Sequence, residues 1–351
     1  MLIMTVAVSA LDPASVDAGA TAHYGDPVRE QRLLTDAAGL VDRSHRGVLA
    51  VPGADRLSWL HSLTTQHLER LAPMTGTELL VLSPHGHVEH HAGVLDDGTT
   101  TWLDVEPGSD LLGYLQRMVF MMRVEPADVT AEWALLSLVG PDTDAVLAAA
   151  GVPPLAAPDV LPVPDAKFAT GTVGARPTAM YAAAPAFGGW VRRVPGGADL
   201  LVPRASVDEV AAALGVPWAG IWAFEAMRVE ARRPRLGFET DHRTLPAEAG
   251  WTAPGVHLEK GCYRGQETVA RVHHLGRPPR KLVLLHLDGV TTDDLPAPQT
   301  PVLNADGRTV GFVGTAVRHH ELGQVALALV KQNVAAGTVL HVGPSTAQVD
   351  L

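Results

Sequence analysis

The hydrophobic and polar positions in the first part of the chain switch between the period of a strand and that of a helix. Strand-like stretches rich in apolar residues cover 46–51, 78–82, 88–95, 100–105 and 133–139. Helical spacing covers 33–40, 54–63 and 110–122. Turn signals such as Pro52-Gly53 and Asp97-Gly98 separate these stretches. The pattern predicts short helices and strands mixed along the chain.

The second half of the chain begins with helical patterns and ends with strands. Residues 206–209 (SVDE) have the spacing of a capping box and Gly215 is a helix stop, so we expect a helix between them. A second helix is expected over 218–232, because Pro234 prevents its continuation. Short strand-like stretches follow at 281–287, 302–304, 308–313 and 325–330. They favour a small antiparallel barrel, reached through a hinge at 276–280.

Two stretches lack a regular pattern. Residues 1–22 are small and weakly patterned, and we expect a loose arm there. Residues 151–166 are apolar and rich in proline, which is typical of a surface connection.

The composition indicates a globular chain with more than one domain. Of its 351 residues 46% are hydrophobic and 19% are charged, which is enough apolar surface for two or three cores. The net charge of −11 argues against general nucleic-acid binding, which needs a basic surface. The segment 228–281 differs from the rest, with eleven basic and six acidic residues. It is either a solvated surface or a pocket for an anionic ligand.

The cysteine count and the N-terminus bear on location. Cys262 is the single cysteine, which excludes an intrachain disulfide and a CxxC zinc or redox motif. The apolar N-terminal stretch lacks a preceding basic region, so a signal peptide is not expected. No run of about 18 apolar residues is present to span a membrane. We therefore expect a cytoplasmic protein without a membrane partner.

The expected helix before Pro234 places one carboxylate on its apolar side. At helical spacing Glu225, Arg228 and Arg232 form a polar stripe, and Glu230 projects among apolar residues on the opposite side. A buried carboxylate must be paired or hydrogen-bonded, or its pKa rises until it is neutral. Glu230 then either pairs with a nearby arginine or awaits a ligand such as a pterin, whose two parallel N–H donors one carboxylate can accept.

Two motifs in the basic segment carry a family resemblance. Residues 227–231 (MRVEA) are similar to the LRxEA segment of the glycine-cleavage T-protein superfamily, in which the glutamate contacts the pterin. Residues 260–267 (KGCYRGQE) resemble the signature of the YgfZ branch of folate-binding proteins, whereas the T-proteins carry a related segment without cysteine. Weaker matches lie at 41–44, 51–55, 236–241, 244–248 and 310–314. The resemblance covers residues 24–340, roughly.

The resemblance implies an α+β fold: a three-lobed, T-protein-like ring around a central folate channel. Two lobes would be α/β and the third a C-terminal antiparallel β-barrel. Together with the hydrophobic pattern, the resemblance predicts an N-terminal α/β region at residues 24–135 and a C-terminal barrel at residues 276–351. Between them, residues 136–275 would form the second α/β region, which contains both motifs. The two α/β lobes would be interleaved, so that each lobe includes segments from both regions of the sequence.

The ligand implied by the resemblance is tetrahydrofolate or a related folate. The cofactor-binding residues it indicates are Glu230, Arg228, Lys260, Tyr263, Arg264 and Gln266. YgfZ-type proteins are linked to the assembly or repair of iron–sulfur proteins, so the resemblance implies an accessory protein with iron–sulfur client or assembly partners. Two alternatives stay open. One is a folate-dependent aminomethyltransferase, and the other is a scaffold that retains the ring without binding folate.

The segment that matches the catalytic region of the T-proteins lacks their aspartate. In T-proteins this aspartate follows a glycine turn in a GGxxDD-like segment. The matching residues 85–91 read HGHVEHH, with Glu89 and His90 at the acidic positions. The extra methylene of Glu89 moves its carboxylate from the place that aminomethyl transfer requires. We therefore do not expect an active aminomethyltransferase.

The same segment raises the question of a metal. If it were one continuous strand, His85, His87, Glu89 and His91 would point to one face. Four such positions span about 20 Å, so one ion cannot collect them all. We expect solvent-facing histidines and no metal site.

Cys262 has three interpretations. It is a structural residue near the channel, a reactive thiol, or an iron–sulfur ligand. Lys260 and Arg264, two positions to either side, would favour the reactive thiolate. A cluster normally needs four thiolates, so one cysteine would hold a cluster only together with partner chains.

Overall fold

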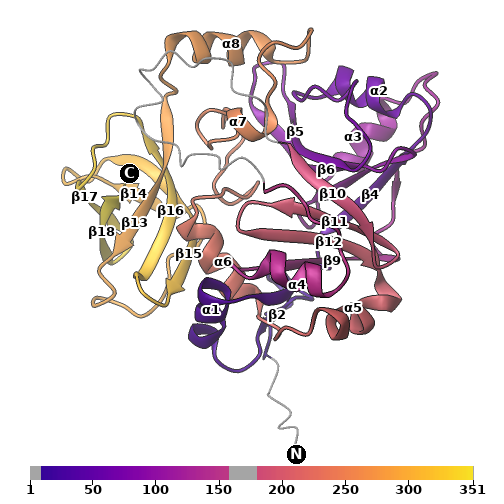
Figure 1. The fold of residues 1–351 in the computed structure, drawn as a ribbon. Helices are drawn as coiled ribbons and strands as arrows, with labels where there is room; N and C mark the ends of the chain where they lie inside the picture. The colour runs from indigo at the N-terminus through magenta and orange to yellow at the C-terminus, as the bar shows by residue number, and fades with distance from the viewer. Residues whose placement is uncertain (1–8, 158–179, 351) are drawn as a thin grey trace, which may run out of the picture.

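A ten-stranded sheet and a closed six-stranded barrel make up most of the structure (Figure 1). The computed structural model describes residues 9–157 and 180–350. Helix α6 (Ile221–Glu230) lies between the sheet and the barrel, beside α1 (Pro27–Asp36) (Figure 1). The predicted α+β fold with a C-terminal antiparallel barrel is confirmed.

One half of the ten-stranded sheet comes from the first part of the chain. Its strands are β4 (Gly47–Pro52), β5 (Thr75–Leu82), β6 (Val88–Asp96), β7 (Thr100–Val105) and β8 (Ala127–Asp128). Leu79 and Leu103 of these strands pack with Leu60 of α2 (Arg56–Leu63) and Leu115 of α3 (Leu111–Arg117). The alternating pattern read from the sequence therefore located these strands correctly, apart from the very short β8.

The other half of the sheet mixes early and late segments. Its strands are β3 (Gly39–Asp42), β9 (Trp133–Val139), β10 (Tyr181–Ala186), β11 (Gly189–Val194) and β12 (Gly197–Pro203). Helices α4 (Thr143–Ala149) and α5 (Val207–Leu214) contribute to its core. The two halves join where β10 pairs with β5, with Tyr181 opposite Gly76. Because this seam is the middle of the sheet, side chains from β5, β6 and β10 meet there.

The barrel is formed by the end of the chain. Its strands are β13 (Arg280–Leu287), β14 (Pro301–Leu303), β15 (Thr309–His319), β16 (Gly323–Lys331), β17 (Val339–Val342) and β18 (Ser345–Asp350). The first four match the predicted strands. The sequence-based prediction omitted β17 and β18, in which every second side chain is exposed. A closed barrel needs these two strands because an open edge would leave backbone groups unpaired.

Helix boundaries follow local capping chemistry. Asp26 caps α1 by accepting from the backbone N–H groups of Val28 and Arg29. Gly215 ends α5 in the left-handed conformation, with φ of 65°, as expected for a glycine stop. The side chain of Ser206 makes no capping hydrogen bond, so the predicted capping box is wrong. Helix α3 ends at Arg117, earlier than predicted, and the chain then turns at Phe120 with φ of 46°.

The N-terminal segment is not a loose arm where it is described. Strands β1 (Ser9–Ala10) and β2 (Thr21–His23) pair, and Asp17 between them is buried. Its carboxylate contacts Arg235 and His45, so the arm supplies charge to the interior. The local sequence pattern could not predict this burial, because Arg235, which pairs with Asp17, lies far along the chain.

Two further expectations concern connections and membranes. The predicted surface connection lies largely outside the described residues, which resume at residue 180. Among the described helices none combines the length and the apolar character needed to cross a membrane.

Candidate functional site

Helix α6 buries two residues of the polar stripe that the sequence pattern indicated. Glu225 and Arg228 are only 8% and 5% exposed. Ala226 and Val229 pack against barrel strands, whereas Ala223 packs in a separate cluster towards α1. Because α6 is covered on more than one side, a single apolar stripe does not describe it. The predicted division into a polar stripe and an apolar side therefore does not separate exposed residues from buried ones.

Arg228 has no N–H group left for a ligand. Its Nε and Nη2 donate to the carboxylate of Glu225, and Nη2 also donates to Thr315 Oγ1 at 2.6 Å. Its Nη1 donates to the backbone carbonyl of Arg233 and to Glu239 at 3.4 Å. These bonds use all five N–H groups of the guanidinium. The residue expected to bind a cofactor instead ties α6 to strand β15.

Arg235 lies at the centre of a buried ionic network. Its guanidinium contacts Asp17 at 2.7 Å, Glu106 at 2.8 Å and Glu225 at 3.2 Å. Arg46 contacts the same Glu106 at 2.6 Å. Burial alone would raise the pKa of Glu106, but the charges of Arg46 and Arg235 outweigh it and lower this pKa to about 2. The network fixes α6 against the end of β7 and the N-terminal segment.

Glu230 is exposed, which contradicts the expected burial. Its side chain is 51% exposed, and its carboxylate lies 3.4 Å from Nε2 of His319 on the barrel. The physical reason is position: Glu230 is the last residue of α6, where the packed part of the helix ends. The other carboxylate of α6, that of Glu225, forms ion pairs with Arg228 and Arg235. Glu230 is thus the carboxylate of this helix that an external donor can reach.

Lys260, at the start of the KGCYRGQE segment, points into the protein. Its Nζ donates to the backbone carbonyls of His61, Thr64 at 2.6 Å and Gln66 at 3.1 Å. The residue is 5% exposed, and burial lowers the pKa of its ammonium to about 8. Its three N–H groups are all used. Lys260 therefore holds the loop after α2, and it offers a ligand nothing in this arrangement.

Two more residues of the segment serve the loop itself. Tyr263 is buried in a cluster with Leu80 and Trp251, and burial raises the pKa of its hydroxyl to about 12. The Nε2 of Gln266 donates to the carbonyl of Lys260 at 3.2 Å. The side chains of the segment that face solvent include Cys262 and Arg264. Of the cofactor-binding residues predicted in this segment, Lys260 and Tyr263 are therefore buried, whereas Arg264 is accessible.

The KGCYRGQE loop packs directly on the turn between β5 and β6. Gly265 has φ of 80°, and a Cβ at this position would lie 2.7 Å from the Cα of Gly86. A Cβ on Gly86 would in turn meet the side chain of Thr268 at 2.7 Å. Two glycines are therefore required for this close approach. The contact brings together the two segments that the sequence marked for function.

An ion pair links the same two segments at the surface. The guanidinium of Arg264 lies 3.3 Å from the carboxylate of Glu89. Val81 pairs with His90 and Leu82 with Val88, so Glu89 is the extra residue of a β-bulge. His85 and His87 lie in the turn before β6. The expectation that His85, His87, Glu89 and His91 share one strand face is therefore wrong.

Comparison with known proteins gives the relationship. The chain is 31% identical to the aminomethyltransferase of Moorella thermoacetica over 340 residues, which are 90% of this chain and 83% of that protein. The chain belongs to the aminomethyltransferase family. The family member of Shouchella clausii is 28% identical over 320 residues, 88% of this chain and 82% of that protein. No family model matches the chain.

The fold of this family member agrees with that of a solved structure. The glycine cleavage system aminomethyltransferase T from Bartonella henselae superposes with a TM-score of 0.74. The match covers 98% of this chain and 92% of that one, at 19% sequence identity. The predicted T-protein-like fold is confirmed.

The family's catalytic segment corresponds, by the resemblance, to the start of β6. Here Glu89 faces Arg264, and the ring of His90 lies 5.9 Å from that of Tyr114. Burial lowers the pKa of His90. This family member therefore combines a glutamate in an ion pair with a histidine that burial keeps neutral.

His91 belongs to a buried polar cluster that the sequence did not reveal. Its Nε2 lies 2.8 Å from Glu78, whose carboxylate also accepts from the hydroxyl of Tyr181 at 2.6 Å. The ring of His91 stacks on Trp251, with centroids 4.8 Å apart. Burial and the charge of Glu78 raise the pKa of Tyr181. Glu78, His91 and Tyr181 come from β5, β6 and β10 and meet only at the seam of the sheet.

Two adjoining clefts open beside the turn before β6. One has a volume of about 500 Å³, and its wall is formed by Pro84, His85, His87, Leu245, Glu267, Thr268 and Arg271. The other, of about 660 Å³, extends to the barrel and includes Arg243 and Lys331. His87 and Leu245 contribute to both clefts. Four of the lining side chains are cations, which suits an anionic ligand: Arg243, Arg271, Arg280 and Lys331.

Cys262 is an exposed free thiol. The two cations expected to activate it have other partners, since Lys260 binds backbone carbonyls and Arg264 binds Glu89. The charge argument for a thiolate therefore loses its basis. The exposure of the thiol to a reagent or a partner stands.

Proposed function

We propose that this family member binds tetrahydrofolate, with Glu230 accepting hydrogen bonds from the pterin. The accessibility of Glu230 carries the proposal. Arginines neutralise Glu225 one and a half turns earlier on α6, whereas Glu230 has only a 3.4 Å contact with His319. This contact with His319 is long, so the carboxylate oxygens keep lone pairs that can accept two parallel N–H groups.

The paired clefts support a ligand with a charged tail. Folates carry carboxylates at the end opposite the pterin, and Arg243, Arg271 and Lys331 line the clefts. Another lining arginine, Arg280, is already held by Asp241 at 2.7 Å and Glu248 at 2.8 Å. A folate tail in these clefts would therefore meet the first three cations and not Arg280.

The finer function that we propose is a cytoplasmic accessory role for iron–sulfur enzymes. It is supported by the resemblance of residues 260–267 to the YgfZ signature and by the exposure of Cys262. Complementation tests it in cells that lack the gene. The Cys262→Ser chain should fold and bind folate but fail to restore iron–sulfur enzyme activity. Full restoration would remove the thiol from the function.

Aminomethyl transfer is the second candidate, because the relatives of this chain are named aminomethyltransferases. Against it stands the glutamate at the family's acid position, already engaged by Arg264. A glycine-cleavage assay with the partner carrier protein decides between the two. We expect no turnover above background. Robust turnover would make the transferase the leading function.

Titration calorimetry with tetrahydrofolate tests the binding itself. Measurable heat and a raised unfolding temperature are expected, as follows for a ligand that binds only the folded chain. If neither is observed at millimolar ligand, the chain is a scaffold that keeps the family fold without its ligand.

A further inference from the structure

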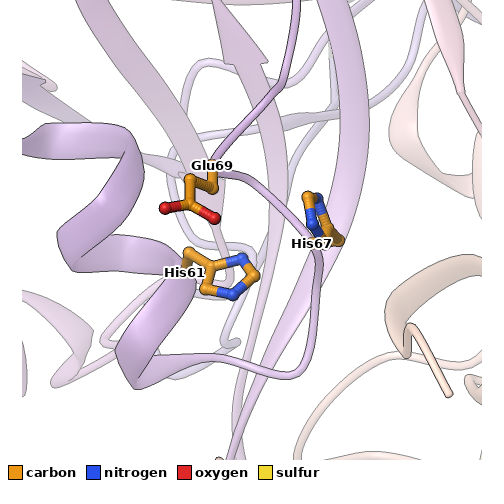
Figure 2. A group of neighbouring side chains, drawn as sticks. All are labelled: His61, His67 and Glu69. Atoms are coloured by element: carbon orange, nitrogen blue, oxygen red, sulfur yellow. The ribbon is translucent and has the colours of Figure 1, made fainter. Parts of the chain in front are cut away.

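A group of metal-ligating side chains lies away from the clefts, at the end of α2. His61 is in the last turn of this helix, and His67 and Glu69 follow in the loop. One ligand atom from each lies within 4.8 Å of the other two. Figure 2 shows the three side chains beside one another, contributed by the helix end and the loop that follows it. Their spacing is short enough for one ion to contact all three.

A fourth imidazole stands next to this group. The ring of His257 lies 5.2 Å from that of His67, which itself lies 4.7 Å from the ring of His61. The Nδ1 of His257 is buried and has no hydrogen-bond partner among the described residues. A buried nitrogen without a partner is costly, and a metal ion or an ordered water is the usual remedy. A third histidine, from a second segment, thus lies beside the group of His61, His67 and Glu69.

The backbone that carries these ligands is held in place before any ion binds. Lys260 Nζ donates to the carbonyls of His61 and Gln66, and the backbone N–H of His257 donates to Thr65 at 3.0 Å. The amide of Gln66 also accepts from the backbone N–H of His67 at 2.9 Å. A site whose ligands are fixed by such bonds needs little rearrangement to bind.

The donor set indicates the class of ion. Imidazole nitrogens with one carboxylate suit zinc and similar transition metals, whereas calcium and magnesium prefer oxygen ligands. Metal binding at Nδ1 of His61 would break one existing hydrogen bond. The backbone N–H of Leu68 donates to this nitrogen at 3.3 Å, which is a long and therefore weak bond.

We propose that His61, His67 and Glu69, with His257 as the fourth group, bind one divalent transition-metal ion of the zinc class. The ion ties the loop after α2 to the segment that leads into KGCYRGQE. This inference does not depend on folate binding, since none of its ligands lines the clefts.

The test uses the full chain after removal of metals with a chelator and subsequent removal of the chelator. Zn²⁺ alone is titrated in competition with a chromophoric indicator, and one ion per chain is expected. His67→Ala should weaken the affinity by about tenfold or more, and Glu69→Gln should weaken it less. Glu69 is exposed, so its substitution leaves the fold intact. The exposed His242 serves as the control, and His242→Ala should leave the affinity unchanged.

Cobalt provides a second measurement on the same variants. Co²⁺ in the site should give visible d–d absorption that is lost in His67→Ala and kept in His242→Ala. Zinc affinity and cobalt absorption that are unaffected by His67→Ala and Glu69→Gln would overturn the proposal. So would a stoichiometry near zero for the wild-type chain.

Discussion

The guanidinium of Arg264 lies 3.3 Å from the carboxylate of Glu89, and the pair joins the KGCYRGQE loop to the bulge of β6. Both side chains are well exposed, at 40% and 37%. Lys260, four residues earlier, is the opposite case, because its ammonium is buried against three carbonyls. Two cations of one motif therefore have different roles.

This difference predicts unequal effects of the same substitution. Arg264→Met should change the free energy of unfolding by less than about 1 kcal/mol, as is usual for exposed ion pairs. Lys260→Met leaves three buried carbonyls without a donor and should cost about 3 kcal/mol or more. Urea unfolding of both variants measures this. Equal losses of unfolding free energy in the two variants would mean that Lys260 does not stabilise the loop after α2.

The ionic network around Arg235 should be essential for folding stability. Arg235→Met leaves the carboxylates of Asp17, Glu106 and Glu225 with one cation fewer, and the excess negative charge in the interior typically costs about 3–5 kcal/mol. The matched control is Arg123→Met, since Arg123 is 76% exposed in its pair with Asp55 and its loss should hardly move the unfolding midpoint. An Arg235→Met chain as stable as the control would contradict the structural role of the network.

Acid should weaken the same network. The folded-state pKa of Glu106 is about 2, below its ordinary value of 4.5. A lowered pKa means that the stability from this carboxylate is complete above about pH 4.5 and is lost as the pH falls towards 2. Glu106→Gln should be less stable at neutral pH and should decline less over this acid range. Parallel stability curves for the two chains would refute this assignment.

The exposure of Cys262 has a direct chemical consequence. A disulfide reagent such as Ellman's should titrate one thiol per chain under native conditions, with no increase after denaturation. Cys262→Ser should remove the signal and leave the unfolding midpoint unchanged. A thiol that reacts only after denaturation would show that the loop buries it.

The sequence was sufficient for elements whose determinants are local. The alternation in β5, β6 and β7 located these strands, and Gly215 ended α5 as expected. The pairing of β17 with β18 was missed because barrel closure, and not local pattern, requires it. The motif at 227–231 led to the correct family, whereas the YgfZ branch indicated by residues 260–267 stays a prediction.

Orientation within the candidate site was less predictable. The burial of Glu225 and Arg228 was not predicted, because the sequence does not show that α6 packs on several sides. The bulge at Glu89 depends on pairing with β5, and the Glu78–His91–Tyr181 contacts depend on a seam between distant strands. The group of His61, His67 and Glu69 had a local signal, two histidines and a glutamate within nine residues, but proximity depends on the turn after α2.

The most direct test of the account is the affinity of Glu230→Gln for tetrahydrofolate, measured by calorimetry. The amide keeps the shape of the side chain but removes the charge and one acceptor, so binding should weaken about tenfold to a hundredfold. Glu209→Gln, an exposed glutamate on α5, should bind as the wild type does. A Glu230→Gln chain that binds tetrahydrofolate as tightly as the control would contradict the proposed role of Glu230.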